Sequence, residues 1–189
     1  MEAGRTRTRW TYAEFARLPS EGSARYEVID DELYMTPSPS LGHQRIVTDL
    51  VVRLGAFVRS NQLGELFVSP LDVLFAEGDY VEPDLLFVRR DREGILSDRG
   101  VEGAPDLVVE VLSPSTAARD RGIKLERYRL FGVAEYWIVD PDSRTVELWR
   151  LAAGADKPVM LAPPDQLRWE PVPEGPRLEI PLEDLLGPA

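Results

Sequence analysis

The stretch Asp106-Leu-Val-Val-Glu-Val-Leu-Ser-Pro-Ser-Thr116 decides the fold, because it joins a buried strand to the start of a helix. Residues 106–112 are apolar apart from Asp106 and Glu110, a composition typical of a strand in the interior of a sheet. A carboxylate within such a strand is costly unless it is paired or binds a metal. Glu110 is therefore a candidate ligand, and the structural alternative is a carboxylate near the strand end that reaches solvent.

The bulk composition is that of one ordinary globular domain. The chain has 189 residues, 43% hydrophobic and 29% charged, which is enough to bury a sizeable core. It has no cysteine, which excludes disulfides and cysteine metal clusters. The segment after Met1 lacks the apolar region of a signal peptide, and no apolar run approaches the roughly 18 residues that span a membrane. We therefore expect a single cytoplasmic domain over residues 1–189 with no membrane association.

The net charge of -11 counts against non-specific binding to nucleic acid. Such binding draws its affinity from Lys and Arg side chains that neutralise phosphates. A local basic groove stays possible. Two charged clusters are candidates for it, Arg89-Arg90-Asp91-Arg92 and Arg119-Asp120-Arg121, and we interpret both as solvated surface rather than as part of such a groove.

Turn signals and hydrophobic periodicity predict an α/β (α+β) fold, with a mixed central β-sheet flanked by helices. The predicted helices are 11–18, 43–60 and 115–131, and the predicted strands are 65–76, 82–88, 106–112, 135–140 and 144–151. A loop is expected over 89–104, and a hairpin over 26–35 turns at Asp30-Asp31. The core covers about 43–151. An N-terminal helix and hairpin precede it in 1–42, and an irregular, proline-rich C-terminal extension follows in 152–189.

Two Pro-Asp pairs compete to supply the partner of Glu110. Asp106 shares its strand and its face, but four residues of strand separate their Cα atoms by roughly 13 Å. Asp84, after Pro83, lies on a separate strand that can be an immediate neighbour, roughly 5 Å away. We therefore choose Asp84, and Pro105 then only marks where the strand of Asp106 begins.

Lys124 is one of only two lysines in the chain, beside 20 arginines. On the helix predicted over 115–131 it shares a stripe with Tyr128 and Phe131, and this stripe should face the sheet. The helix would then carry the amine towards Glu110. The alternatives are a structural ion pair, or a lysine at the edge of the stripe whose ammonium reaches solvent.

His43 is the only histidine, so no histidine-based zinc site can form. It could bind a phosphate or assist proton transfer, and the alternative is a local hydrogen bond at the start of its helix. Gln44 beside it could contact the same ligand. Among the acids of the predicted hairpin, Glu27 is the candidate, because Tyr26 and Val28 flank it.

Pro83-Asp84, Glu110 and Lys124, in this order of elements, resemble the restriction-endonuclease-like PD-(D/E)XK nuclease superfamily. The resemblance extends to one bacterial branch of it, the Uma-two group. It covers about residues 10–151, and the matching segments are 26–33, 37–40, 43–46, 82–85, 103–116, 124–128 and 132–141.

The resemblance implies a metal site in which Asp84 and Glu110 hold Mg²⁺ or Mn²⁺, helped by the carbonyl of Val111. It also implies that Lys124 orients or deprotonates the attacking water and stabilises charge on the phosphorane. The chain departs from the usual motif at Leu112, where the superfamily has its lysine two residues after the acid. Lys124 must then supply the amine from the following helix.

The expected function is metal-dependent hydrolysis of phosphodiester bonds by an endonuclease that acts on DNA rather than RNA and forms a homodimer or higher homo-oligomer. One rival is a catalytically silent nuclease fold that serves as a binding or assembly module, which the acidic charge favours. The other is a two-carboxylate hydrolase acting on sugars, which needs neither metal nor lysine.

Overall fold

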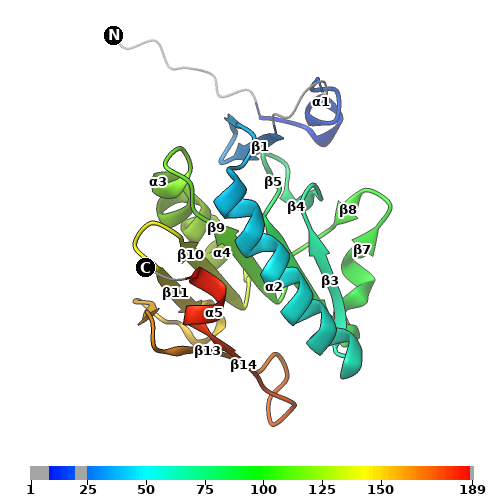
Figure 1. Ribbon diagram of the computed structural model, residues 1–189. Helices are drawn as coiled ribbons and strands as arrows, with labels where there is room; N and C mark the ends of the chain where they lie inside the picture. The colour runs from blue at the N-terminus through cyan, green and yellow to red at the C-terminus, as the bar shows by residue number, and fades with distance from the viewer. Residues whose placement is uncertain (1–8, 20–24, 188–189) are drawn as a thin grey trace.

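The central sheet of the molecule has six strands and contains the stretch around Glu110 (Figure 1). The computed structural model describes residues 9–19 and 25–187. In spatial order the strands are β12 (Val159–Leu161), β11 (Thr145–Arg150), β10 (Glu135–Asp140), β9 (Leu107–Val111), β6 (Leu85–Arg89) and β3 (Gly64–Val68). Strands β9 and β10 are parallel, whereas the other neighbours are antiparallel, so the predicted mixed sheet is confirmed.

Helices cover both faces of this sheet, as the sequence predicted. Helix α2 (Leu41–Ser60) crosses one face of the sheet (Figure 1). Its Leu50 and Leu54 side chains lie in one buried cluster with Phe87 and Val109. Helix α4 (Leu125–Phe131) lies on the other face, where Tyr128 packs in the cluster of Val108. Within the part of the chain that the structure describes, no helix has the length and apolar character needed to cross a membrane.

A second six-stranded sheet lies beside the first and was not predicted. Its order is β2 (Glu32–Thr36), β1 (Arg25–Ile29), β5 (Asp79–Val81), β4 (Val73–Ala76), β8 (Gly100–Val101) and β7 (Leu96–Ser97). Helix α1 (Tyr12–Phe15), which starts with the predicted capping box of Thr11 and Glu14, packs Phe15 on this sheet. The hairpin of β1 and β2 is confirmed, but it belongs to this sheet and is not a separate addition.

Prolines interrupt two of the strands that were predicted to lie in a single sheet. The predicted strand 65–76 is divided into β3 and β4 by residues 69–72, which include Pro70. The predicted strand 82–88 begins only at Leu85, because residues 82–84 with Pro83 link β5 of one sheet to β6 of the other. Proline cannot donate to a strand ladder, so both ladders stop there. The expected loop 89–104 contains a 3₁₀ turn (Arg90–Ile95) and strands β7 and β8. Asp84 consequently lies where the two sheets join.

The helix predicted over 115–131 is interrupted. It consists of α3 (Ala117–Arg119), a π-helical turn (Asp120–Lys124) and α4. Gly122 leaves the helical conformation inside this turn, at φ -108° and ψ -106°. π-Helical turns of this kind are frequent at functional sites. Here the turn buries both Asp120 and Lys124.

The expectation of an irregular C-terminal extension over 152–189 is wrong. Strand β12 extends the central sheet, β13 (Gln166–Trp169) pairs with β14 (Leu178–Pro181), and α5 (Leu182–Leu186) follows. Trp169 packs edge-on against Phe87 and Trp137, at ring-centroid distances of 5.0 and 5.8 Å. The alternation of exposed and buried residues in β13 was the available signal, and the prolines between the strands obscured it.

Candidate active site

Asp84 and Glu110 meet because β6 and β9 are antiparallel neighbours. Leu85 lies opposite Val109, so Asp84, immediately before β6, comes beside Glu110. The Asp84 and Glu110 side chains are only 5% and 6% exposed. Both line a cavity of about 210 Å³ at the junction of the two sheets. The strand-end alternative, in which Glu110 reaches solvent, is therefore wrong.

Lys124 points into the same cavity. Its Nζ atom lies 2.5 Å from Glu110 Oε1, 2.9 Å from Glu27 Oε1 and 3.6 Å from Asp120 Oδ1, and its side chain is 2% exposed. Burial alone would lower the pKa of Lys124, but these three carboxylates raise it well above its usual value. The expected inward orientation is confirmed, and the alternative of an ammonium in solvent is wrong. The geometry suits an ion pair as well as a catalytic amine.

Glu27, from β1, is the second anchor of that ammonium. It also accepts a hydrogen bond from the backbone N–H of Glu82 at 3.2 Å and lies 3.4 Å from the guanidinium of Arg119. Burial would raise the pKa of Glu27, but the charges of Lys124 and Arg119 lower it. Glu27 is therefore a negative charge that holds the Lys124 ammonium together with Glu110.

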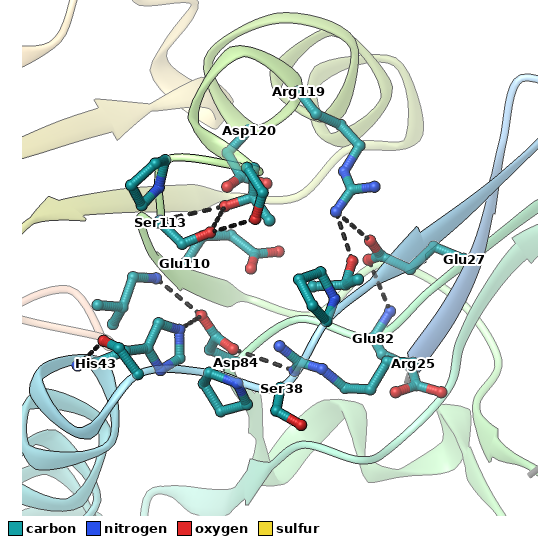
Figure 2. A pocket seen from close by; sticks show the side chains of 18 of the residues that line it. Arg25, Glu27, Ser38, His43, Glu82, Asp84, Glu110, Ser113, Arg119 and Asp120 are labelled. Carbon is teal, nitrogen blue, oxygen red and sulfur yellow. Dashed lines mark hydrogen bonds and ion pairs between the residues drawn. The ribbon is translucent and has the colours of Figure 1, made fainter. Parts of the chain in front are cut away.

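His43 is held at the start of α2, where its backbone N–H donates to Ser40 Oγ at 3.2 Å. Its Nε2 atom lies 2.9 Å from Asp84 Oδ2, and the ring is buried (Figure 2). The same Oδ2 atom accepts the Val111 N–H at 2.9 Å, and Arg25 Nη1 lies 3.2 Å from Oδ1. Burial would raise the pKa of Asp84, but His43, the Val111 N–H and Arg25 lower it. The local hydrogen bond expected as the alternative is present, and the ring reaches the candidate site as well.

Glu110 has a different environment from Asp84. Its Oε1 atom accepts a hydrogen bond from the Tyr128 hydroxyl at 2.9 Å in addition to its contact with Lys124. Burial, followed by the nearby charges of Asp120, Asp84 and Glu27, raises the pKa of Glu110 to about 8 despite the ammonium. One acid of the pair is thus held ionised while the other retains a proton more readily.

Several cavity residues were missed by the sequence analysis. The run Arg119-Asp120-Arg121 is not solvated surface as predicted, since Asp120 is buried and the Arg119 side chain is 12% exposed. Only Arg121 lies on the outside, 2.6 Å from Glu147. A sequence signal existed, because Asp120 is four residues before Lys124 and such residues share a helix face. Burial, with Asp72 nearby, also raises the pKa of cavity residue Glu82 to about 7.

Gln44 does not join the group. It is exposed and lines a separate hollow on the outer side of α2 with Leu41 and Thr48. Consecutive residues of a helix point about 100° apart, so the residue after an inward His43 turns away from the cavity. The expectation that both residues contact one ligand is wrong for this structure.

The cavity is lined by both cations and carboxylates. Three permanent cations, Arg25, Arg119 and Lys124, face a larger set of carboxylates, namely Glu27, Glu82, Asp84, Glu110 and Asp120. No group of three or more His, Cys, Asp or Glu side chains within residues 9–19 and 25–187 has the arrangement of a metal site. A metal at Asp84 and Glu110 would therefore have two carboxylate ligands, which is usual for Mg²⁺, an ion that keeps several of its waters. Because burial raises the pKa of Glu82 and Glu110, the net charge of the cavity depends on their protonation, and a bound cation would favour their ionised forms.

Comparisons with known proteins point to nucleases. The Uma2 protein family, described as "Putative restriction endonuclease", matches residues 12–182. An uncharacterized protein of Synechocystis sp. is 27% identical over 139 residues, which is 72% of this chain and 78% of that protein. The crystal structure of a protein from Anabaena variabilis, described as "a putative nuclease belonging to DUF820", matches with a TM-score of 0.77 at 22% identity. The match covers 93% of this chain and 97% of that one, and it shows a common mixed α/β fold.

Proposed function

Because this chain belongs to the Uma2 family, described as "Putative restriction endonuclease", we propose that it is a metal-dependent endonuclease with a restriction-endonuclease-like core that hydrolyses phosphodiester bonds in DNA. One observation carries the proposal. Two acids from neighbouring strands and one ammonium from the following helix meet in a single buried cavity, with Lys124 Nζ 2.5 Å from Glu110 Oε1.

Asp84 and Glu110 would hold Mg²⁺ or Mn²⁺, with the carbonyl of Val111 as a further ligand. Mg²⁺ and Mn²⁺ bind to oxygen ligands more favourably than softer metals do. The chemistry that such an ion supplies is polarisation of the phosphodiester and a lowered pKa of water. The His43 ring and the Tyr128 hydroxyl act as positioning groups, because each fixes one of the two carboxylates.

Lys124 would stabilise charge rather than remove a proton. Its ammonium is bound by three carboxylates, and its raised pKa keeps it protonated. A protonated lysine can orient the attacking water and neutralise negative charge that develops on the phosphorane. Of the two roles that the family resemblance implied, orientation therefore fits this environment better than deprotonation.

A homodimer remains a prediction, and light scattering on the purified protein would check it.

The experiment is a cleavage assay with supercoiled plasmid and circular single-stranded DNA in Mg²⁺, in Mn²⁺ and in EDTA. We expect metal-dependent cleavage that falls by at least about 100-fold in Asp84→Asn and in Lys124→Met, because each removes several kcal/mol of transition-state stabilisation. Asp106→Asn, the other Pro-Asp pair, is the matched control and should keep its activity once circular dichroism shows that it is folded.

A second candidate function is a silent binding or assembly module, which the net charge of -11 favours. The same assay separates the two. Absence of cleavage with every metal and both substrates supports the module. A two-carboxylate hydrolase would likewise leave both DNAs intact, but it would hydrolyse a glycoside substrate in EDTA.

A further inference from the structure

Resting on the proposed function, we infer that the substrate strand is single-stranded DNA, or a single-stranded tail on a duplex, and not the interior of a duplex. Three features of the cavity carry this inference: its depth, the two loops at its mouth, and the small number of positive groups that a phosphate could meet.

The candidate reacting groups are almost inaccessible from outside the cavity. The side chains of Asp84, Glu110 and Lys124 are almost fully buried in the cavity, so a phosphate must enter it to touch them. A DNA duplex is stiff, with a persistence length of about 150 base pairs. Its phosphates lie on the outer surface, and each is held in line by its neighbours along the strand. A single strand has free backbone torsions and can fold one phosphate inwards. A flexible single strand can therefore bring a phosphate to the recessed carboxylates more readily than an intact duplex can.

Two loops of serine and proline form the mouth. One is Pro37–Ser40, which leads into α2, and the other is Ser113–Thr116, which leads into α3. In Figure 2, Ser38 and Ser113 lie on opposite sides of Asp84 and Glu110. Serine hydroxyls both donate and accept, so they can bind phosphate oxygens and sugars without carrying charge. Proline rings at the mouth offer apolar surface to an unstacked base.

The charges near the mouth suit a short contact with one strand. The two guanidiniums that line the cavity belong to Arg25 and Arg119, which already contact Asp84 and Glu27. Proteins that hold duplex DNA usually neutralise many phosphates, and this chain carries a net charge of -11. If both guanidiniums exchange these carboxylates for phosphates, they neutralise about two phosphates, and we then expect a slope of log K against log salt of about -1.4 for a single strand.

The test uses one oligonucleotide sequence in three forms with Mn²⁺: single strand, blunt duplex, and duplex with a single-stranded tail. We expect the single strand and the tail to be cut at least about 30-fold faster than the duplex interior, because a stiff duplex cannot bend one phosphate into the cavity without being deformed. Equal rates on the single strand and the duplex interior, both lost in Asp84→Asn, overturn this inference and leave the endonuclease proposal standing. No cleavage of any form by protein that binds Mn²⁺ overturns the endonuclease proposal itself.

A rim variant tests the role of the two loops. The double substitution Ser38→Ala with Ser115→Ala should raise KM for the single strand and leave Mn²⁺ affinity unchanged. Ser60→Ala, an exposed serine at the far end of α2, is the matched control. If KM for the single strand does not change in the rim variant, the assignment of the mouth as the strand-binding surface is overturned.

Discussion

Lys124 Nζ lies 2.5 Å from Glu110 Oε1, and this contact joins the helical segment after β9 to the strand itself. The ammonium also lies 2.9 Å from Glu27 Oε1 of the second sheet. One buried cation thus connects both sheets and the helical layer. Any loss of it must affect the fold as well as the chemistry.

Lys124→Met should therefore lower both stability and activity. Removing one partner of a buried ion pair costs about 3 kcal/mol or more, because the remaining charges lose their compensation. Urea unfolding of the variant and the wild type measures this cost. Lys157→Met, at an exposed lysine, is the control and should unfold like the wild type. A Lys124→Met protein of unchanged stability would show that the ion pair contributes nothing to folding.

Glu110→Gln should change how the stability of the metal-free protein depends on pH. The pKa of Glu110 is about 8 when folded and about 4.3 when unfolded, so the folded state holds the extra proton. Stability from this group is complete below pH 4.3 and is lost as pH rises through 8. In EDTA, as pH rises through this window, the free energy of unfolding of the wild type should fall by up to about 1.4 kcal/mol per pH unit more than that of Glu110→Gln.

Urea titrations between pH 5 and pH 8.5 measure that difference. Glu65→Gln, at an exposed glutamate on β3, is the control and should follow the wild type. Parallel pH profiles for the wild type and Glu110→Gln would contradict the raised pKa.

Arg25→Met should strengthen Mn²⁺ binding. Arg25 Nη1 lies 3.2 Å from Asp84 Oδ1, so its positive charge competes with a metal for the same carboxylate. Loss of this charge-assisted hydrogen bond corresponds to about a tenfold lower Kd. Isothermal titration calorimetry measures it. Arg119→Met is the matched control, because Arg119 contacts Glu27 instead and should shift the Kd less. Weaker binding by Arg25→Met would show that Arg25 orients Asp84 rather than competing for it.

His43→Asn should weaken Mn²⁺ binding. Nε2 of His43 fixes Asp84 Oδ2 at 2.9 Å, and loss of such a supporting contact typically weakens metal binding by about 10- to 100-fold. The same titration measures it. Gln44→Ala, one residue away on the outer face of α2, should bind Mn²⁺ like the wild type. If both variants behave alike, His43 does not position Asp84.

The sequence predicted the centre of the site because strand and helix periodicity are local. The spacing of apolar residues placed Asp84 and Glu110 on separate strands and Lys124 on an inward stripe. The choice of Asp84 as the partner of Glu110 came from the distance between Asp106 and Glu110 along one strand. Their convergence in one cavity agrees with that placement. Their roles in metal binding and hydrolysis remain predictions.

The wall of the cavity could not be predicted in the same way. The π-helical turn at Gly122 changes which residues face inwards, and it buries Asp120 beside Lys124. Arg25 reaches Asp84 only because a second sheet forms, and that sheet depends on pairings between strands far apart in the chain. The C-terminal strands were missed because the proline content of this segment indicated irregular structure, and the alternation of polar and apolar residues in β13 covers only four residues. Long-range pairing of short strands leaves little local signal.

The most direct test of the account is anomalous diffraction from a crystal of this protein soaked in Mn²⁺. We predict an anomalous peak between the carboxylates of Asp84 and Glu110, in the wild type and in Lys124→Met but not in Asp84→Asn. A peak bound by other residues, or no peak at saturating Mn²⁺, would contradict the proposed metal-dependent site.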